Sequence, residues 1–224
     1  MTPNATAADA CWYRLGMTRW RIALAAAVLY AVMWVGYLQN WVWLHGLDWS
    51  LLNASHDIAV KHPAWVQFWS GFTYVFGPEP LRLLGLVAAA VLLVRRNVRA
   101  ALLVVTCAPL NGLVTTGAKA LANRPRPPTM LEYAPSTSFP SGHALEATAA
   151  WLALLTLLLP VLSASLRRVA IAVAAVVLVL VGISRVALNV HYPSDVLAGW
   201  ALGYLYFLLC LLVFRPRAPL VTAQ

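Results

Sequence analysis

This chain of 224 residues contains few charges, but three of its side chains are candidates for catalysis: His143, His191 and Asp195. Histidine can act as a nucleophile, an acid or a base near neutral pH. His191 and Asp195 are four residues apart, and Pro193 between them is typical of the first turn of a helix. A hydrogen bond from the His191 ring to Asp195 would fix the tautomer and leave the other ring nitrogen free to attack.

Basic residues near these histidines predict what such a nucleophile would attack. Three of them stand at the ends of apolar segments or in the loop that follows: Lys119, Arg126 and Arg185. Ser141 and Gly142 precede His143 at another predicted helix start, where serine is a good N-cap and glycine lets a ligand approach the backbone. Cations and helix-start N–H groups together favour a phosphate. His143 would then protonate the leaving oxygen and later activate water.

Two further charged residues near this group have more than one interpretation. Glu146 lies three residues after His143, so both can share one helix face. It is either a first-turn carboxylate favoured by the helix dipole, or a residue that recognises a head group or tunes His143. Arg124 is either an additional phosphate ligand or a solvated loop charge. Both residues are therefore candidate neighbours of the site.

The elements that must hold these residues are membrane helices. Hydrophobic residues make up 62% of the chain and charged residues only 10%, whereas soluble domains contain about 25% charged residues. Segments of about 20 apolar residues span a bilayer. The sequence has six candidates: 22–44, 80–94, 100–118, 144–162, 169–187 and 196–214. They predict an all-α integral membrane bundle of six helices, in which Pro160 stops the fourth.

Positive charge is distributed unevenly along this predicted topology, and the net charge is +9. If six helices alternate, ten arginines fall on one side: Arg14, Arg19, Arg21, Arg95, Arg96, Arg99, Arg167, Arg168, Arg215 and Arg217. Excess positive charge marks the cytoplasmic side. We therefore expect both termini in the cytoplasm and the histidines on the opposite face. The short tails suggest a compact bacterial protein, for which this would be the periplasmic face of the inner membrane. Because this charge follows the topology and forms no single basic face, it does not indicate nucleic-acid binding.

The chain is expected to form one membrane domain at 22–214, between cytoplasmic tails at 1–21 and 215–224. The longest connection, 45–79, is rich in aromatic residues, which concentrate at membrane interfaces. We predict a short interfacial helix at 62–72 that anchors this segment over the bundle. A metal site is the alternative for the ionisable residues there: His45, Asp48, His56, Asp57 and His62. Their irregular spacing favours the anchor, and no metal or other cofactor is predicted.

Three motifs give these residues a family resemblance. Lys119 and Arg126-Pro127 fit a Lys, six residues, Arg-Pro pattern, and residues 140–143 read PSGH. Ser184-Arg185, five residues, His191, three residues and Asp195 form the third motif. In this order and spacing they resemble the type 2 phosphatidic acid phosphatase superfamily. The motifs cover residues 119–195, and six spans with the motifs on one side extend the resemblance over most of the chain.

The resemblance implies a six-helix bundle that hydrolyses phosphomonoesters or diphosphates without a metal. It implies that His191 is the nucleophile, that Asp195 is its partner and that His143 is the general acid. It also implies a set of phosphate ligands: Lys119, Arg126, Ser141, Gly142 and Arg185. Arg124 lies outside the motif.

A site between helix ends at the interface suits a lipid whose tails stay in the bilayer, so we expect a membrane lipid as substrate. Polyprenyl diphosphate, phosphatidylglycerol phosphate and phosphatidic acid are the leading candidates. A phosphotransferase would use the same phosphohistidine but pass the phosphoryl group to a lipid hydroxyl. A transporter would show inverted repeats and charges at the bilayer midplane, whereas this sequence has no repeat and its charges cluster at one face. The sequence does not indicate the oligomeric state.

Overall fold

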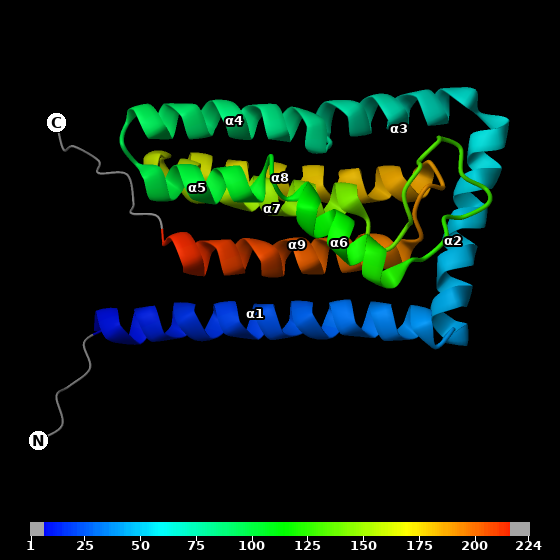
Figure 1. The fold of residues 1–224 in the computed structure, drawn as a ribbon, viewed down its shortest axis with the longest axis horizontal. Coiled ribbons are helices and arrows are strands. Elements are labelled where there is room, and N and C mark those ends of the chain that lie inside the picture. The colour runs from blue at the N-terminus through cyan, green and yellow to red at the C-terminus, as the bar shows by residue number, and fades with distance from the viewer. Residues whose placement is uncertain (1–6, 216–224) are drawn as a thin grey trace, which may run out of the picture.

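The computed structural model describes residues 7–215, with side chains from residue 20 onward. The regular elements in this part of the chain are all helices (Figure 1): α1 (Ala7–Leu38), α2 (Val42–Lys61), α3 (Pro63–Phe76), α4 (Pro78–Val94), α5 (Val98–Cys107), α6 (Gly112–Ala122), α7 (Gly142–Leu158), η1 (Leu159–Val161), α8 (Ala164–Ala187) and α9 (Pro193–Phe214). Within the described part of the chain, six segments are long and apolar enough to cross a membrane: Trp20–Leu38, Pro63–Val94, Val98–Ala122, Gly142–Val161, Ala164–Ala187 and Pro193–Phe214. The predicted six-span bundle is confirmed.

The structure corrects one prediction near the start of the bundle and leaves another as a prediction. The first span ends at Leu38 instead of residue 44, because Asn40 adopts a φ of 51° and turns the chain into α2. Asparagine tolerates this left-handed conformation better than most residues. The segment predicted as an interfacial helix at 62–72 is helical from Pro63 onward, within α3, which continues the line of α4 (Figure 1). Its place at the membrane interface stays a prediction. Trp69 of α3 packs against Leu188 beyond α8, whereas Phe68 and Tyr74 of the same helix are exposed.

Helix α2 crosses one end of the bundle at a steep angle to the other helices (Figure 1). Its inward face buries four residues at helical spacing: Leu44, Asp48, Leu52 and Ala59. Such a periodic apolar stripe is the usual face that a helix turns toward a core. The exception is Asp48, which is fully buried and brings a carboxylate into this end of the bundle.

Prolines set several of the helix boundaries. Helix α7 ends just before Pro160, as predicted, and the 3₁₀ turn η1 that contains this proline follows directly. Pro109 separates α5 from α6 within the third span, since proline cannot donate a helical hydrogen bond. The Asn111 side chain donates to the carbonyl oxygen of Cys107 at 2.7 Å near this break. Pro193 begins α9 in its first turn, as the sequence predicted.

Helices α7 and α9 pack closely because glycines lie at their contact. A Cβ on Gly199 would lie 2.6 Å from the carbonyl oxygen of Ser141, and one on Gly203 would lie 2.5 Å from that of Leu145. Small residues four apart let membrane helices approach in this way. The close approach places the start of α9 beside the start of α7, which carries His143.

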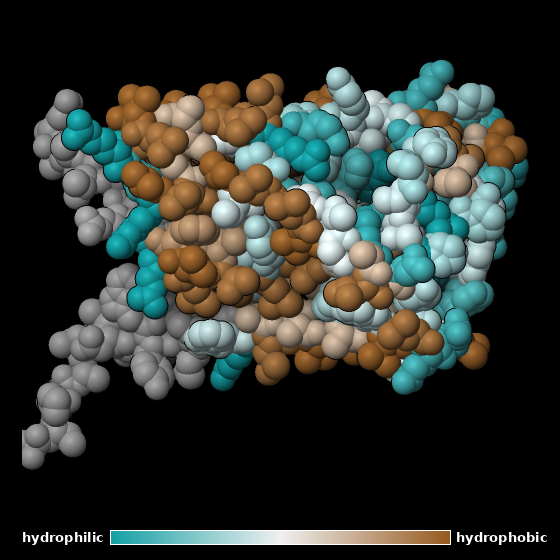
Figure 2. All heavy atoms as spheres, in the orientation of Figure 1, coloured by the Kyte–Doolittle hydropathy of each residue, from teal (hydrophilic) through white to brown (hydrophobic). Residues whose placement is uncertain are grey.

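The two ends of the bundle differ. The α4–α5 connection, the start of α8 and the end of α9 lie at the end opposite α2, and a hydrophobic band separates the two hydrophilic ends (Figures 1 and 2). Five of the predicted cytoplasmic arginines belong to those connections: Arg95, Arg96, Arg99, Arg167 and Arg168. Of the predicted tails, residues 1–6 and 216–224 lie outside the described residues, while residues 7–21 already belong to α1.

Candidate active site

A polar cavity of about 410 Å³ lies between α3, α4, α6, α7 and α8. Both predicted catalytic histidines and three predicted phosphate ligands line it: His143, His191, Lys119, Arg126 and Arg185. Hydrophilic side chains interrupt the hydrophobic band between α4 and α6 (Figure 2). The fold therefore brings together residues that the sequence placed in separate segments, and it leaves their surroundings polar at the side of the bundle.

His191 lies directly before α9 and is only 2% exposed. Its Nδ1 is 3.4 Å from Oδ2 of Asp195, and its Nε2 is 3.3 Å from a guanidinium nitrogen of Arg126. The backbone N–H of Tyr192 donates to the same Asp195 oxygen at 2.9 Å, which orients the carboxylate. Burial, followed by positive charges led by that of Arg126, lowers the pKa of His191 well below its ordinary 6.5. The imidazole is therefore neutral at pH 7.

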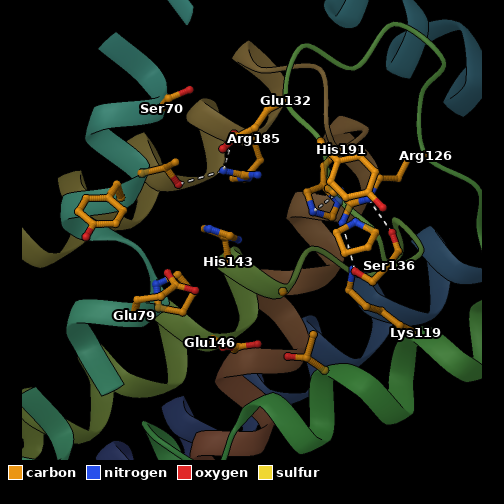
Figure 3. A pocket seen from close by; sticks show the side chains of 18 of the residues that line it. Ser70, Glu79, Lys119, Arg126, Glu132, Ser136, His143, Glu146, Arg185 and His191 are labelled. Atoms are coloured by element: carbon orange, nitrogen blue, oxygen red, sulfur yellow. Dashed lines mark hydrogen bonds and ion pairs between the residues drawn. The ribbon is translucent and has the colours of Figure 1, made fainter. Parts of the chain in front are cut away.

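Two cations from different segments converge beside His191. Lys119 Nζ donates to Ser136 Oγ at 3.0 Å and to the carbonyl oxygen of Thr137. Arg126 donates to the carbonyl oxygen of Ser136 at 2.6 Å and to its Oγ at 3.3 Å. Both cations thus meet at one hydroxyl oxygen near the histidine (Figure 3). Sequence reasoning did not single out Ser136, and the serine- and threonine-rich loop was the only signal for it.

Arg185 supplies a third cation from α8 and is 5% exposed. One of its guanidinium nitrogens donates to Thr73 Oγ1 at 3.1 Å and lies 3.9 Å from a carboxylate oxygen of Glu132. Its Nε is buried and has no hydrogen-bond partner among the residues that the structure describes. Arg185 lines the cavity, and a guanidinium in this position is suited to an anion such as phosphate.

His143 lies in the first turn of α7, and its ring stands on the cavity wall apart from the group around His191 (Figure 3). Gly142 before it also lines the cavity. A Cβ at this position would lie 2.9 Å from Thr115 Cγ2, so the absence of a side chain lets α6 and α7 pack closely here. The backbone at this helix start faces the cavity, as expected for a phosphate site.

Ser141 is placed differently from the other predicted phosphate ligands. It is fully buried and does not line the cavity. Its backbone N–H donates to the carbonyl oxygen of Asp195 at 2.9 Å, and its hydroxyl has no partner among the described side chains. It occupies the predicted N-cap position without a side-chain capping bond. The structure thus shows Ser141 joining α7 to α9 behind the cavity wall.

Arg124 matches neither interpretation drawn from the sequence. It is 6% exposed, and its guanidinium donates to Asp195 Oδ1 at 2.7 Å and to Asp48 Oδ2 at 2.8 Å. The group also lies 3.9 Å from the ring centre of Tyr192 and 4.9 Å from that of Tyr37, at cation–π distance. Burial acts to lower the pKa of Arg124, but the two carboxylates raise it above its ordinary value. Arg124 is a permanently charged link behind the cavity.

Asp48 is a second functional candidate, after Ser136, that sequence reasoning missed. The sequence grouped it with irregularly spaced histidines and aspartates as a weaker metal alternative. Across the described side chains, no three His, Cys, Asp or Glu residues gather into a possible metal site. His45 instead accepts a hydrogen bond from Trp49 at 3.0 Å. The available signal was a lone acid on the apolar face of a helix, because a buried charge requires a partner.

Glu146 forms a short ion pair that the sequence did not predict. It is 5% exposed, and its Oε2 lies 2.5 Å from a guanidinium nitrogen of Arg82 on α4. Glu79 is 4.0 Å from the same guanidinium. All three residues line the cavity. The cavity therefore has an acidic side near α4 in addition to the cationic side near His191 (Figure 3).

Residues 100–219, more than half of the chain, match the PAP2 superfamily, and the chain belongs to this superfamily. It is 48% identical over 77 residues to phosphatidylglycerophosphatase B of Bacillus subtilis (strain 168), a match that spans 33% of this chain and 37% of that relative. The crystal structure of the first transmembrane PAP2 type phosphatidylglycerolphosphate phosphatase from Bacillus subtilis aligns with a TM-score of 0.73 and 26% identity, over 84% of this chain and 93% of that one. The predicted resemblance is confirmed, and the chain is a multi-pass bacterial membrane protein.

Proposed function

We propose that this chain is a membrane lipid phosphatase that holds the phosphoryl group on His191 before water releases it. The observation that carries this proposal is the placement of His191. Asp195 lies behind its Nδ1, while its Nε2 is at a cavity wall shared with Lys119, Arg126 and Arg185. Ionisable groups at membrane depth are expensive, and so many of them around one cavity mark a functional site.

The geometry supports a reaction in two steps. In the first, Nε2 of His191 attacks phosphorus, the bond between phosphorus and the lipid oxygen breaks, and His143 donates a proton to that oxygen. In the second, His143 takes a proton from water, the water oxygen attacks phosphorus, and the phosphorus–nitrogen bond breaks to release phosphate. Asp195 holds the tautomer of the ring throughout. Three cations balance the charge on the phosphoryl group: Lys119, Arg126 and Arg185.

We further propose that hydrolysis needs no metal and that the substrate is a lipid phosphomonoester or diphosphate. Phosphatidylglycerol phosphate comes first, because both similar proteins are named for that activity. Polyprenyl diphosphate and phosphatidic acid are the alternatives. We expect the protein, purified in detergent, to release phosphate from at least one of these lipids equally well with and without EDTA. Chelator-sensitive release would contradict the metal-free mechanism, and phosphate appearing on a second lipid would identify a phosphotransferase.

We propose that residues 22–214 form a phosphatase domain in the bacterial inner membrane, with both termini cytoplasmic and the cavity toward the periplasm. The arginine-rich connections at the end opposite α2 support this orientation, because positive charge accumulates on the cytoplasmic side. A reporter enzyme that is active only in the cytoplasm, fused after residue 224, is expected to be active. Activity of a periplasmic reporter at that position would reverse the orientation.

Replacing Glu146 by glutamine is expected to change substrate preference while leaving phosphohistidine formation intact. A Cβ on Gly142 would lie 3.6 Å from Glu146 Oε1 and 3.9 Å from Lys119 Cε, so this carboxylate is next to the proposed phosphate site. A negative charge there disfavours a second phosphate on the substrate. We expect Glu146→Gln to raise kcat/KM for a polyprenyl diphosphate relative to a phosphomonoester on the order of 10-fold. Asp57→Asn, on the exposed surface of α2, is the charge-matched control, and equal relative rates in both variants would reject the prediction.

A further inference from the structure

Arg124 joins three separate elements behind the proposed nucleophile. It lies in the loop after α6, its partner Asp195 is in the first turn of α9, and its partner Asp48 comes from α2. Both carboxylates are fully buried, and the arginine is nearly so. Arginine suits this place because its planar fork can bond two carboxylates at once while it stacks on the Tyr192 ring.

Asp48 also holds the start of α9 in place. Its Oδ1 accepts the backbone N–H of Ser194 at 2.9 Å, and its Oδ2 accepts the Ser194 hydroxyl at 2.6 Å. That hydroxyl in turn accepts a bond from Arg124 at 2.7 Å. A helix start has unpaired N–H groups that a carboxylate satisfies well. Here the cap comes from another helix, so α2 is tied to the segment that presents His191.

Neither Arg124 nor Asp48 lines the cavity, although both connect to the nucleophile through Asp195. A role in substrate binding therefore does not follow from their positions. Arg124 contacts Asp195 directly, and Asp48 is connected to Asp195 through Arg124. Asp195 is the carboxylate that faces Nδ1 of His191. We propose that Asp48 and Arg124 are positioning residues that hold Asp195 ionised and correctly oriented behind His191. This inference rests on the proposed phosphohistidine mechanism.

The charges around His191 explain why such a link is required. Charged or titratable groups face it from every neighbouring element: Asp195 from α9, Arg126 from the loop, Lys119 from α6, Arg185 from α8 and His143 from α7. The cations and burial keep the imidazole neutral. Without Arg124, the buried Asp195 carboxylate would lose its closest positive charge, and it would either take a proton itself or retain one on His191. A protonated Asp195 no longer orients the His191 ring, and a protonated His191 has no free nitrogen with which to attack.

The test compares wild-type protein with Arg124→Gln, Arg124→Lys and Asp48→Asn in detergent, using phosphatidylglycerol phosphate as substrate. We expect Arg124→Gln to lower kcat about 100-fold with little change in KM. A loss of this size is seen when residues that orient the ligands of metal sites are replaced. We expect the acidic limb of its kcat/KM profile to move to higher pH. Arg124→Lys should recover part of kcat, because lysine keeps the charge but not the fork. Asp48→Asn should lie between Arg124→Gln and the wild type.

Asp57→Asn is the matched control for Asp48→Asn, because it makes the same change on an exposed position of the same helix. It should leave kcat, KM and the pH profile unchanged. A raised KM with normal kcat in Arg124→Gln would overturn the inference in favour of substrate binding. Unchanged kcat and an unmoved acidic limb would overturn it too. If Arg124→Gln does not fold, Arg124→Lys and Asp48→Asn answer the same question. Absence of a phosphoenzyme in an active wild type would instead reject the proposed mechanism.

Discussion

Replacing His191 by alanine is expected to reduce lipid hydrolysis by about 10,000-fold or more, because the proposed nucleophile is lost. No phosphate should become attached to the protein in this variant. The expectation rests on the neutral ring of His191, on its contact with Asp195 and on its place at the cavity wall. The measurement is phosphate release from labelled lipid, together with recovery of labelled protein after rapid denaturation under alkaline conditions, where phosphohistidine survives.

His143→Ala is the matched variant, since it removes the other histidine of the same cavity. It should still accept phosphate from a nitrophenyl ester, whose leaving group needs no proton, but it should be slow with a lipid alcohol. Because the second step also needs His143, labelled protein should accumulate in this variant. Label on His143→Ala but none on His191→Ala would support the assigned roles. Labelled His191→Ala protein would refute His191 as the nucleophile.

Replacing Gly199 by alanine is expected to impair both stability and activity. The added Cβ would lie 2.6 Å from the carbonyl oxygen of Ser141 and 2.8 Å from the Cβ of Ala144, so α7 and α9 must move apart. Overpacking of this kind costs about 1–3 kcal/mol. The same shift separates His143 from His191, and misplacement of about 1 Å can cost about 100-fold in rate. Thermal unfolding in detergent and kcat measure the two effects.

Gly117→Ala is the control for that prediction, because a Cβ there meets no atom within 4 Å. It lies on the exposed side of α6, where alanine is about 1 kcal/mol more favourable than glycine in a helix. This variant should be as stable as the wild type or more stable, with unchanged kcat. A Gly199→Ala protein that behaves like Gly117→Ala would show that the two helices can absorb the methyl group without displacing the site.

The membrane helices were predictable because their signal is local. A span of about 20 apolar residues identifies itself without reference to any other part of the chain. Pro160 and Pro193 likewise act on the backbone beside them, and both predicted boundaries are confirmed. The segment at 62–72 carries a more ambiguous signal. Its aromatic residues suit a membrane surface and a helix contact equally well, and the sequence does not show that Trp69 packs against Leu188.

The residues of the candidate site likewise differ in how far the sequence could predict them. His143, His191 and Asp195 were identifiable because their motifs keep the reactive groups at fixed short spacings along the chain. The ion pairs of Arg124 with Asp195 and Asp48 were not predictable, because these partners are remote in sequence and neither Arg124 nor Asp48 belongs to a motif. The pair between Glu146 and Arg82 escaped prediction for the same reason, since it joins α7 to α4.

The amino-acid sequence was enough to predict the class of structure, the superfamily and five residues that line the cavity: Lys119, Arg126, His143, Arg185 and His191. Hydropathy, proline positions and motif spacing are properties of short segments, so they can be interpreted without knowledge of the fold. Two features emerge only from the packed fold: the contacts of the carboxylate behind His191, and the place of Ser141 behind the cavity wall. Those features depend on which buried charges and backbone groups meet when α2, α7 and α9 pack. A buried charge must be paired, but the sequence does not show which residue is its partner.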